Sequence, residues 1–217
     1  MNNSGWRSAG TGTDGPVVVS GEVKLTTMDD VDETPDSVLA DLARTGDTDA
    51  FCALVVRYQT AAIRLATIVG GSVDDAADIA QEAFVKIFQA LPRHHDLTSV
   101  RSWMLRIVAN EAKNFRRSTT RRARRDARFG SWVSATVADP VSTALDAAEG
   151  EALSAALARL RNRDREVLGY RYFAGLNEAE TAAALNIAPG TVKSRTARAL
   201  ERLRDDVTVR ALREGAT

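Results

Sequence analysis

Apolar residues recur every three or four positions along three successive segments, and this periodicity limits the fold more than any other feature of the sequence. The segments run over residues 51–68, 76–91 and 100–115, and each places its apolar residues on one face of a helix. No segment shows the regular alternation of apolar and polar residues that marks a half-buried strand. The sequence therefore predicts an all-helical protein. In the first segment the predicted buried face consists of Phe51, Leu54, Val55, Tyr58, Ile63, Leu65 and Ile68.

A change of composition divides the helical part of the chain in two. Residues 129–150 contain no basic residue and are rich in Ser, Thr, Ala, Pro and Gly, which is typical of a flexible interdomain linker. We expect one small domain over 36–128, and a second one of four short helices over 151–204. Residues 205–217 would form a C-terminal tail, and residues 1–35, which lack apolar periodicity, a disordered N-terminal extension.

Capping and breaking residues predict where several helices begin and end. Ser72 is a candidate N-cap for the second segment, which Pro92 would end. Asn177 is a candidate N-cap in the second domain, and Asn186 tolerates the left-handed conformation that ends a helix. Thr191 is placed to begin the last helix.

Composition argues against several classes of protein. The chain lacks a stretch of eighteen consecutive apolar residues and a basic-then-apolar leader, so we expect neither membrane insertion nor secretion, and a cytoplasmic location. Cys52 lies in an apolar helical run and is predicted to be a buried small hydrophobe. His94 and His95 have no third ligand at metal-site spacing, so no metal is expected. No pattern of catalytic residues or glycine-rich phosphate loop indicates an enzyme or a cofactor.

Basic residues are concentrated locally although the formal net charge is zero. Between Arg101 and Arg128 ten basic residues are opposed only by Glu111 and Asp126. The chain from Arg159 onward is again rich in arginine. Because affinity for phosphates depends on the local density of cations, these two regions predict two contacts with a polyanion.

The stretch "NIAPGTVKSRTARALERLR" combines a short Pro-Gly turn with an amphipathic basic helix. Its apolar stripe has 4-3-4 spacing and consists of Val192, Thr196, Ala199 and Leu203. Small and basic residues cover the rest of the helix, as in helices that enter the major groove of DNA. This pattern favours a helix-turn-helix, although the last helix of a solvated helical hairpin has the same geometry.

Two longer motifs together resemble the extracytoplasmic-function sigma factors. "REVLGYRYFAGLNEAETAAALNI", followed by "GTVKSRTARALERLR", resembles the region that reads the promoter −35 element in that family. "DDAADIAQEAFVKIFQALPRHHDLTSVRSWMLRIVANEAKNFRR" resembles the region that binds RNA polymerase and the −10 element. The resemblance extends from Val38 to about Arg204, with both regions in the family's order. The chain departs from the family at Thr181, usually isoleucine, and at Asn186, usually glycine.

The resemblance implies roles for three sets of residues. Those matching the surface that grips the β′ clamp coiled coil of the polymerase are Asp74, Asp78, Gln81, Glu82 and Val85. Those matching the −10 site, including a loop that accommodates a flipped base, are Arg93, His94, His95, Asp96, Leu97, Thr98, Ser99, Arg101, Arg106, Asn110, Lys113, Asn114, Arg116 and Arg117. Those matching the −35 site are Thr191, Lys193, Ser194, Arg195, Ala197, Arg198 and Arg202.

The function implied by the resemblance is that of a dissociable, non-catalytic subunit of RNA polymerase. It would bind core polymerase through the β′ and β subunits, recognise the −35 and −10 elements of promoter DNA and promote promoter opening. An anti-sigma factor is a further candidate partner. Two alternatives stay open on the sequence alone: a helix-turn-helix regulator that binds an operator without polymerase, and an RNA-binding helical protein. Trp103 is predicted to be a core anchor, the alternative being a stacking platform for an unpaired base.

Overall fold

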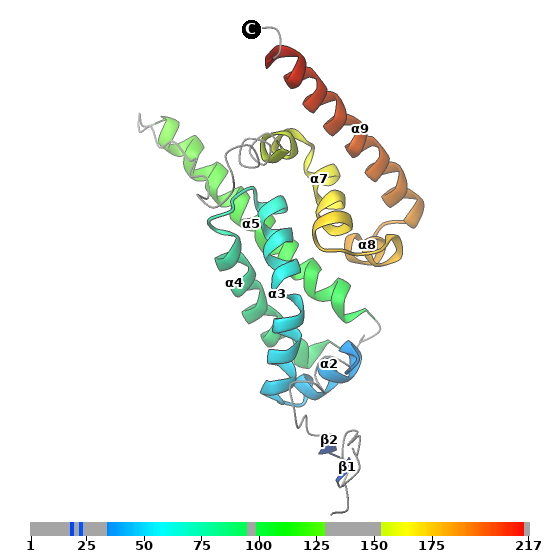
Figure 1. The fold of residues 1–217 in the computed structure, drawn as a ribbon. Coiled ribbons are helices and arrows are strands. Elements are labelled where there is room, and N and C mark those ends of the chain that lie inside the picture. The colour runs from blue at the N-terminus through cyan, green and yellow to red at the C-terminus, as the bar shows by residue number, and fades with distance from the viewer. Residues whose placement is uncertain (1–17, 20–21, 24–33, 95–98, 129–152, 215–217) are drawn as a thin grey trace, which may run out of the picture.

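The protein is helical throughout the part that the computed structural model describes, which comprises residues 18–19, 22–23, 34–94, 99–128 and 153–214 (Figure 1). The helices are α2 (Asp36–Arg44), α3 (Thr48–Gly70), α4 (Ala76–Ala90), the 3-10 turn η1 (Leu91–Arg93), α5 (Val100–Arg128), a helix over 153–159, α7 (Asn162–Leu168), the π-helical segment η2 (Gly169–Phe173), α8 (Glu178–Leu185) and α9 (Pro189–Glu214). The all-helical prediction is confirmed. The exception is the two-residue antiparallel pair β1 (Val18–Val19) and β2 (Glu22–Val23), which the sequence pattern did not predict. The expected linker over 129–150 lies outside the described residues.

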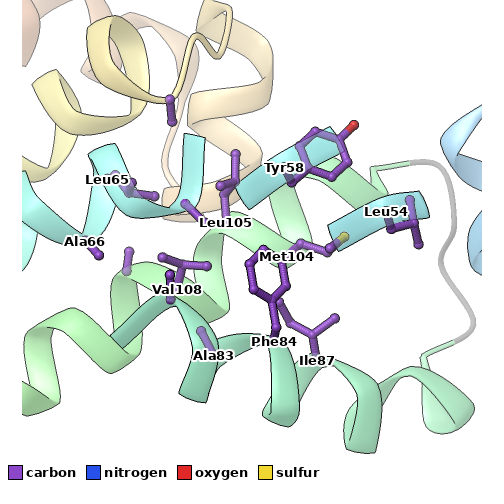
Figure 2. Packing of buried hydrophobic residues seen from close by; sticks show 14 of the residues in the cluster. Leu54, Tyr58, Leu65, Ala66, Ala83, Phe84, Ile87, Met104, Leu105 and Val108 are labelled. Atoms are coloured by element: carbon purple, nitrogen blue, oxygen red, sulfur yellow. The ribbon is translucent and has the colours of Figure 1, made fainter. Parts of the chain in front are cut away.

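Helices α2 to α5 form a bundle around α3. Figure 2 shows its centre, where Phe84 and Ile87 of α4 lie opposite Met104 of α5. The largest side chains with no more than 1% exposure there include Leu54, Leu65, Ile87, Met104, Leu105 and Val108. Burial of a leucine or isoleucine contributes roughly 1.5–3 kcal/mol relative to exposure, so this cluster is the principal source of stability.

Two predictions about α3 are wrong in detail. Cys52 is exposed rather than buried, and Ile63 retains 38% of its side-chain exposure. The buried stripe runs through Leu54, Tyr58 and Leu65, and a period of 3.6 residues places position 63 on the opposite side of the helix from these residues. By length and composition alone α3 could cross a membrane, but here its buried face forms the centre of the bundle.

A polar cluster fastens α2 to α3. Arg57 Nη1 donates hydrogen bonds to Asp36 Oδ1 at 2.5 Å and to the Thr34 carbonyl oxygen at 2.9 Å. The Tyr58 hydroxyl donates to the other oxygen of Asp36. Desolvation and the hydrogen bond to this carboxylate raise the pKa of Tyr58 above its ordinary value. These contacts fix the entry of the chain into the bundle.

The predicted helix ends are partly correct. Asn177 forms a capping box with Glu180 at the start of α8, and Asn186 ends that helix with a φ of 53°, as expected. α4, however, begins at Ala76 with Asp75 as its N-cap residue, and the Ser72 hydroxyl accepts from the Asp75 backbone N–H in the preceding turn. α9 begins at Pro189 rather than Thr191, because proline suits the first helical position.

The two basic helices are longer than the sequence pattern indicated. α5 continues to Arg128 although its apolar stripe ends at Phe115, and α9 continues to Glu214 into the expected tail. Arginine has a high helix propensity, which supports the extension of α5. The hydroxyls of Ser118, Thr119 and Thr120 donate to carbonyl oxygens three or four residues earlier, so their polar groups are satisfied within the helix.

The second half of the chain packs directly on the first. Tyr170 of η2 is fully buried and belongs to the same hydrophobic cluster as Leu65 and Leu105. Gly169 lies so close to α3 that a β-carbon there would be 3.0 Å from Leu65 Cδ1. A smaller core inside the second half joins Leu157, Leu160, Leu168 and Ala199. The two halves therefore share a continuous apolar interface.

Candidate polymerase and promoter-DNA interfaces

The outer face of α4 and the turn before it carry all the residues that were predicted to bind the polymerase clamp. Asp78, Gln81, Glu82 and Val85 are all exposed on this helix, and Asp74 is exposed in the turn before it. Val85 keeps 50% of its exposure at the C-terminal end of this otherwise polar set. We call this surface, Asp74 to Val85, the α4 face.

Sequence reasoning missed an aromatic residue that extends the α4 face. Phe88 is 45% exposed, and its ring packs edge-on against Phe51 of α3 with ring centroids 5.0 Å apart. Phe88 follows Val85 by three positions, so helical spacing could have identified it. The pair adds exposed apolar area next to the carboxylates, a combination suited to a protein partner.

A charge network at the side of the α4 face holds Glu82 in place. Lys86 Nζ lies 3.2 Å from Glu82 Oε1 and 2.5 Å from Glu111 Oε2 on α5. The hydrogen bond to Glu111, followed by that to Glu82, raises the pKa of Lys86. Glu82 is thus shared between this network and the exposed surface.

The segment predicted to accept a flipped base is described only at its two ends. His95, Asp96, Leu97 and Thr98 lie outside the described residues. Arg93 is exposed and Ser99 half-buried. His94 stacks in parallel on the Trp103 ring, with centroids 4.1 Å apart and an interplanar angle of 6°. Trp103 is half-buried against the bundle core, so it combines the predicted anchoring role with an aromatic stack at the edge of the loop.

The residues of α5 that were predicted to contact DNA fall into two groups, one exposed to solvent and one half-buried. Arg106, Asn110, Asn114 and Arg117 are exposed, whereas Arg101, Lys113 and Arg116 are half-buried. Burial is the first cause of a lowered pKa for the Arg116 guanidinium.

Arg101 and Lys113 bind the second half of the chain. Arg101 Nη2 donates to the carbonyl oxygens of Ala174 and Gly175, both at 3.0 Å, and Nη1 lies 3.5 Å from Glu180 Oε1. Lys113 Nζ donates to Glu166 Oε1 at 2.7 Å. Arg101 and Lys113 were predicted to contact DNA, but in this arrangement their side chains donate hydrogen bonds to the second half of the chain.

The exposed surface of α9 gathers four of the residues predicted for the −35 site. Val192 and Ala199 are fully buried and Thr196 and Leu203 half-buried, as the predicted stripe requires. The exposed residues on the remaining surface include Lys193, Ser194, Ala197 and Arg198. The short side chains of Ser194 and Ala197 leave room beside the two cations, Lys193 and Arg198, for the edge of a base. We call these four residues the α9 face.

Of the three other residues predicted for the −35 site, one is ion-paired and two are half-buried. Arg202 forms an ion pair with Asp164, a carboxylate of α7 with 11% side-chain exposure. Arg195 is half-buried and lines a cleft that it shares with α5. Thr191 is half-buried, and its carbonyl oxygen accepts from the Ser194 hydroxyl. The sequence did not indicate the Arg202–Asp164 pair because it depends on the packing of α9 against α7.

The described residues contain no group of three His, Cys, Asp or Glu side chains that could hold a metal ion. Most exposed polar and basic candidate residues of this part of the protein lie on the α4 face, on the α9 face and along α5.

Comparison with known proteins places both halves of the chain in one class. Residues 54–122 match the family model "Sigma-70 region 2", and residues 150–203 match "Sigma-70, region 4". The fold and the two regions define an RNA polymerase sigma factor, a non-enzymatic initiation factor that binds core RNA polymerase and promoter DNA. The operator-binding alternative is not favoured.

The relatives narrow the class further. The chain is 30% identical to the ECF RNA polymerase sigma-E factor of Escherichia coli strain K12 over 203 residues, covering 81% of this chain and 96% of that protein. It is also 30% identical to the RNA polymerase sigma-H factor of Pseudomonas aeruginosa, covering 76% and 90% respectively. The structure of CnrH in complex with the cytosolic domain of CnrY matches with a TM-score of 0.62 and 27% identity, over 80% of this chain and 97% of that one. The chain belongs to the extracytoplasmic-function sigma factors of the sigma-70 family.

Proposed function

We propose that this sigma factor uses three separate surfaces for its three tasks. The α4 face binds the clamp of core RNA polymerase, the polar side of α5 with the loop before it holds the −10 strand, and the α9 face reads the −35 duplex. The observation that carries this assignment is the separate exposure of the α4 and α9 faces on two parts of the chain. One molecule can therefore hold polymerase and duplex DNA at once.

The composition of the α4 face supports a protein partner rather than DNA. Asp74, Asp78 and Glu82 carry negative charge that repels phosphates, while Val85 and Phe88 offer apolar area. A basic, partly apolar helix complements this surface, and the coiled coil of the β′ clamp is the partner implied by the family.

The −10 surface combines cations with stacking. Arg106, Asn110, Asn114 and Arg117 are exposed along α5 and supply phosphate and base contacts. Trp103 with His94 forms an aromatic stack at the edge of the loop, where an unpaired base finds stacking and hydrogen-bonding groups. Extruding a base costs a few kcal/mol, which these contacts offset.

Engagement of the −10 strand requires separation of the two halves. Arg101 and Lys113 reach DNA only after they leave Ala174, Gly175, Glu180 and Glu166. We infer that the packed arrangement is the free protein and that binding to core polymerase favours an open one. Arg195 and Arg202 are secondary −35 contacts, since Arg195 lines the cleft against α5 and Arg202 pairs with Asp164 of α7.

Regulation by an anti-sigma factor fits this arrangement. The CnrH structure contains the cytosolic domain of CnrY, and this chain covers nearly all of CnrH. We propose that an anti-sigma factor binds this protein and holds it inactive, and that the protein acts in the cytoplasm, where the polymerase is.

A charge reversal on the α4 face tests the polymerase assignment. Asp78→Lys should weaken capture of core polymerase by about tenfold or more, since a like charge would then face a basic partner. Asp49→Lys is the matched control, because Asp49 is also an exposed acid in the first turn of a helix. Equal capture by both variants, measured by gel-filtration co-elution, would show that the clamp binds elsewhere.

A further inference from the structure

An open cleft of about 460 Å³ lies between the two halves of the molecule. Its walls are Arg106, Asn110 and Lys113 of α5, Arg163 and Glu166 of α7, Ala184 and Leu185 of α8, Asn186 and Ile187 of the turn, and Arg195 of α9. Because α5 belongs to one half and α7 to α9 belong to the other, the cleft exists only while the halves are packed together.

The cleft concentrates positive charge. It is lined by four cations and a single carboxylate, Glu166, which already pairs with Lys113 at 2.7 Å. Arg106, Arg163 and Arg195 form no ion pair with any carboxylate in the described part of the chain. Packing the halves brings these three guanidinium groups to one cleft, where their repulsion favours a bound polyanion.

The remaining walls of the cleft are apolar or carry amide groups, as a binding surface for a nucleotide base requires. Ala184 is buried, and Leu185 and Ile187 are half-buried, so they offer an apolar surface beside the cations. Asn110 and Asn186 are exposed amides that can donate to and accept from the edge of a base. The volume falls within the range of about 300–1,000 Å³ that is usual for small-molecule sites.

We propose that this cleft binds a nucleoside polyphosphate. The guanidinium groups of Arg106, Arg163 and Arg195 bind the phosphate chain, for which their planar fork of donors is well suited. Leu185 and Ile187 contact the base. No covalent step is involved.

Binding there would oppose promoter recognition. A nucleotide that contacts both halves stabilises the packed form, because it binds that form and not the separated one. It also covers Arg106, Asn110, Lys113 and Arg195, which we assign to DNA. This consequence, unlike the binding itself, rests on the proposed function.

Titration calorimetry of the full chain with ATP, and separately with inorganic tripolyphosphate, both without divalent cations, tests the site. We expect saturable binding of one ATP per chain, weakened about tenfold by Arg163→Gln. Arg163 is chosen because it is exposed and is not among the assigned DNA contacts. The control is Arg161→Gln, which removes the same charge. Arg161 lies two positions before Arg163, is also exposed and lines a different cleft.

Absence of saturable ATP binding, or equal weakening by Arg161→Gln, would overturn the proposal. Equal affinities for tripolyphosphate and ATP would overturn the apolar wall as a base contact. In a second assay, ATP should weaken binding of a single-stranded −10 oligonucleotide to the unaltered protein about tenfold more than to Arg163→Gln. This assay fails if the −10 assignment is wrong, whereas the calorimetry does not depend on it. Circular dichroism establishes that both variants are folded.

Discussion

Lys113 Nζ of α5 lies 2.7 Å from Glu166 Oε1 of α7, and this ion pair connects two regions separated by 53 positions in the sequence. Both side chains are largely buried, with 27% and 14% exposure. Lys113 is also an assigned contact for the −10 strand. Its partner is a carboxylate in the packed form, and we propose that a promoter phosphate replaces this partner when DNA is bound.

Removing the carboxylate should favour the DNA-bound form. Glu166→Gln leaves Lys113 with a weaker acceptor, so affinity of the free protein for a single-stranded −10 oligonucleotide should rise about two- to fivefold. Fluorescence anisotropy measures the change. Asp205→Asn, which removes the same charge from an exposed residue of α9, controls for net charge and should have little effect. An equal rise in both variants would show that Lys113 is not held by Glu166.

A larger side chain in place of Gly169 should separate the two halves of the protein. Gly169 has helical backbone angles, but its β-carbon would lie 3.0 Å from Leu65 Cδ1 and 3.5 Å from methyl groups of Ile68 and Val69. Gly169→Leu overpacks this contact at a typical cost of about 1–3 kcal/mol. X-ray scattering should show a larger radius of gyration. Gly190→Ala is the control, since a β-carbon there meets nothing within 4 Å. An unchanged radius for Gly169→Leu would contradict the shared interface.

We expect Arg198 to contribute to DNA affinity and Arg202 to contribute to the stability of the fold. Arg198 is exposed on the α9 face, so Arg198→Ala should weaken binding of −35 duplex DNA about tenfold with little change in Tm. Arg202 pairs with the largely buried Asp164, so Arg202→Ala should cost roughly 1–3 kcal/mol of stability. Duplex titrations and thermal melts of both variants measure the contrast. A large loss of stability in Arg198→Ala would contradict the assignment.

Tyr170 should make the fold sensitive to alkaline pH. Burial is the first cause that raises the pKa of Tyr170, whose hydroxyl donates to the Leu105 carbonyl oxygen at 3.4 Å. An unfolded tyrosine ionises near pH 10, so protonated folded Tyr170 stabilises the protein fully below that pH and progressively less above it. Between pH 8 and 11, Tyr170→Phe should reduce the fall in unfolding free energy by about 1.4 kcal/mol. Denaturant titrations at both values measure it, and identical losses in the two proteins would count against a buried, protonated Tyr170.

Local patterns predicted the helices and the α4 and α9 faces because a 3.6-residue period fixes which side chains share a surface. The same reasoning left Phe88 unassigned at the edge of a buried face. It placed Cys52 inside because the run around it is apolar, although a 3.6-residue period puts position 52 on the side of α3 opposite Leu54 and Leu65. The contacts of Arg101 with Gly175 and of Lys113 with Glu166 span 74 and 53 positions. Such pairs have no signal in the sequence, since they follow from how η2 and α7 dock on the bundle.

In vitro transcription tests whether this protein directs RNA polymerase to promoters. Purified core polymerase is given a pool of genomic promoter fragments, with and without this protein, and start sites are mapped. We expect new protein-dependent start sites that share elements near −35 and −10, and Arg198→Ala should weaken those that depend on the −35 element. Active core polymerase that yields no new start sites, while the protein still binds discrete duplex sites, would contradict this role.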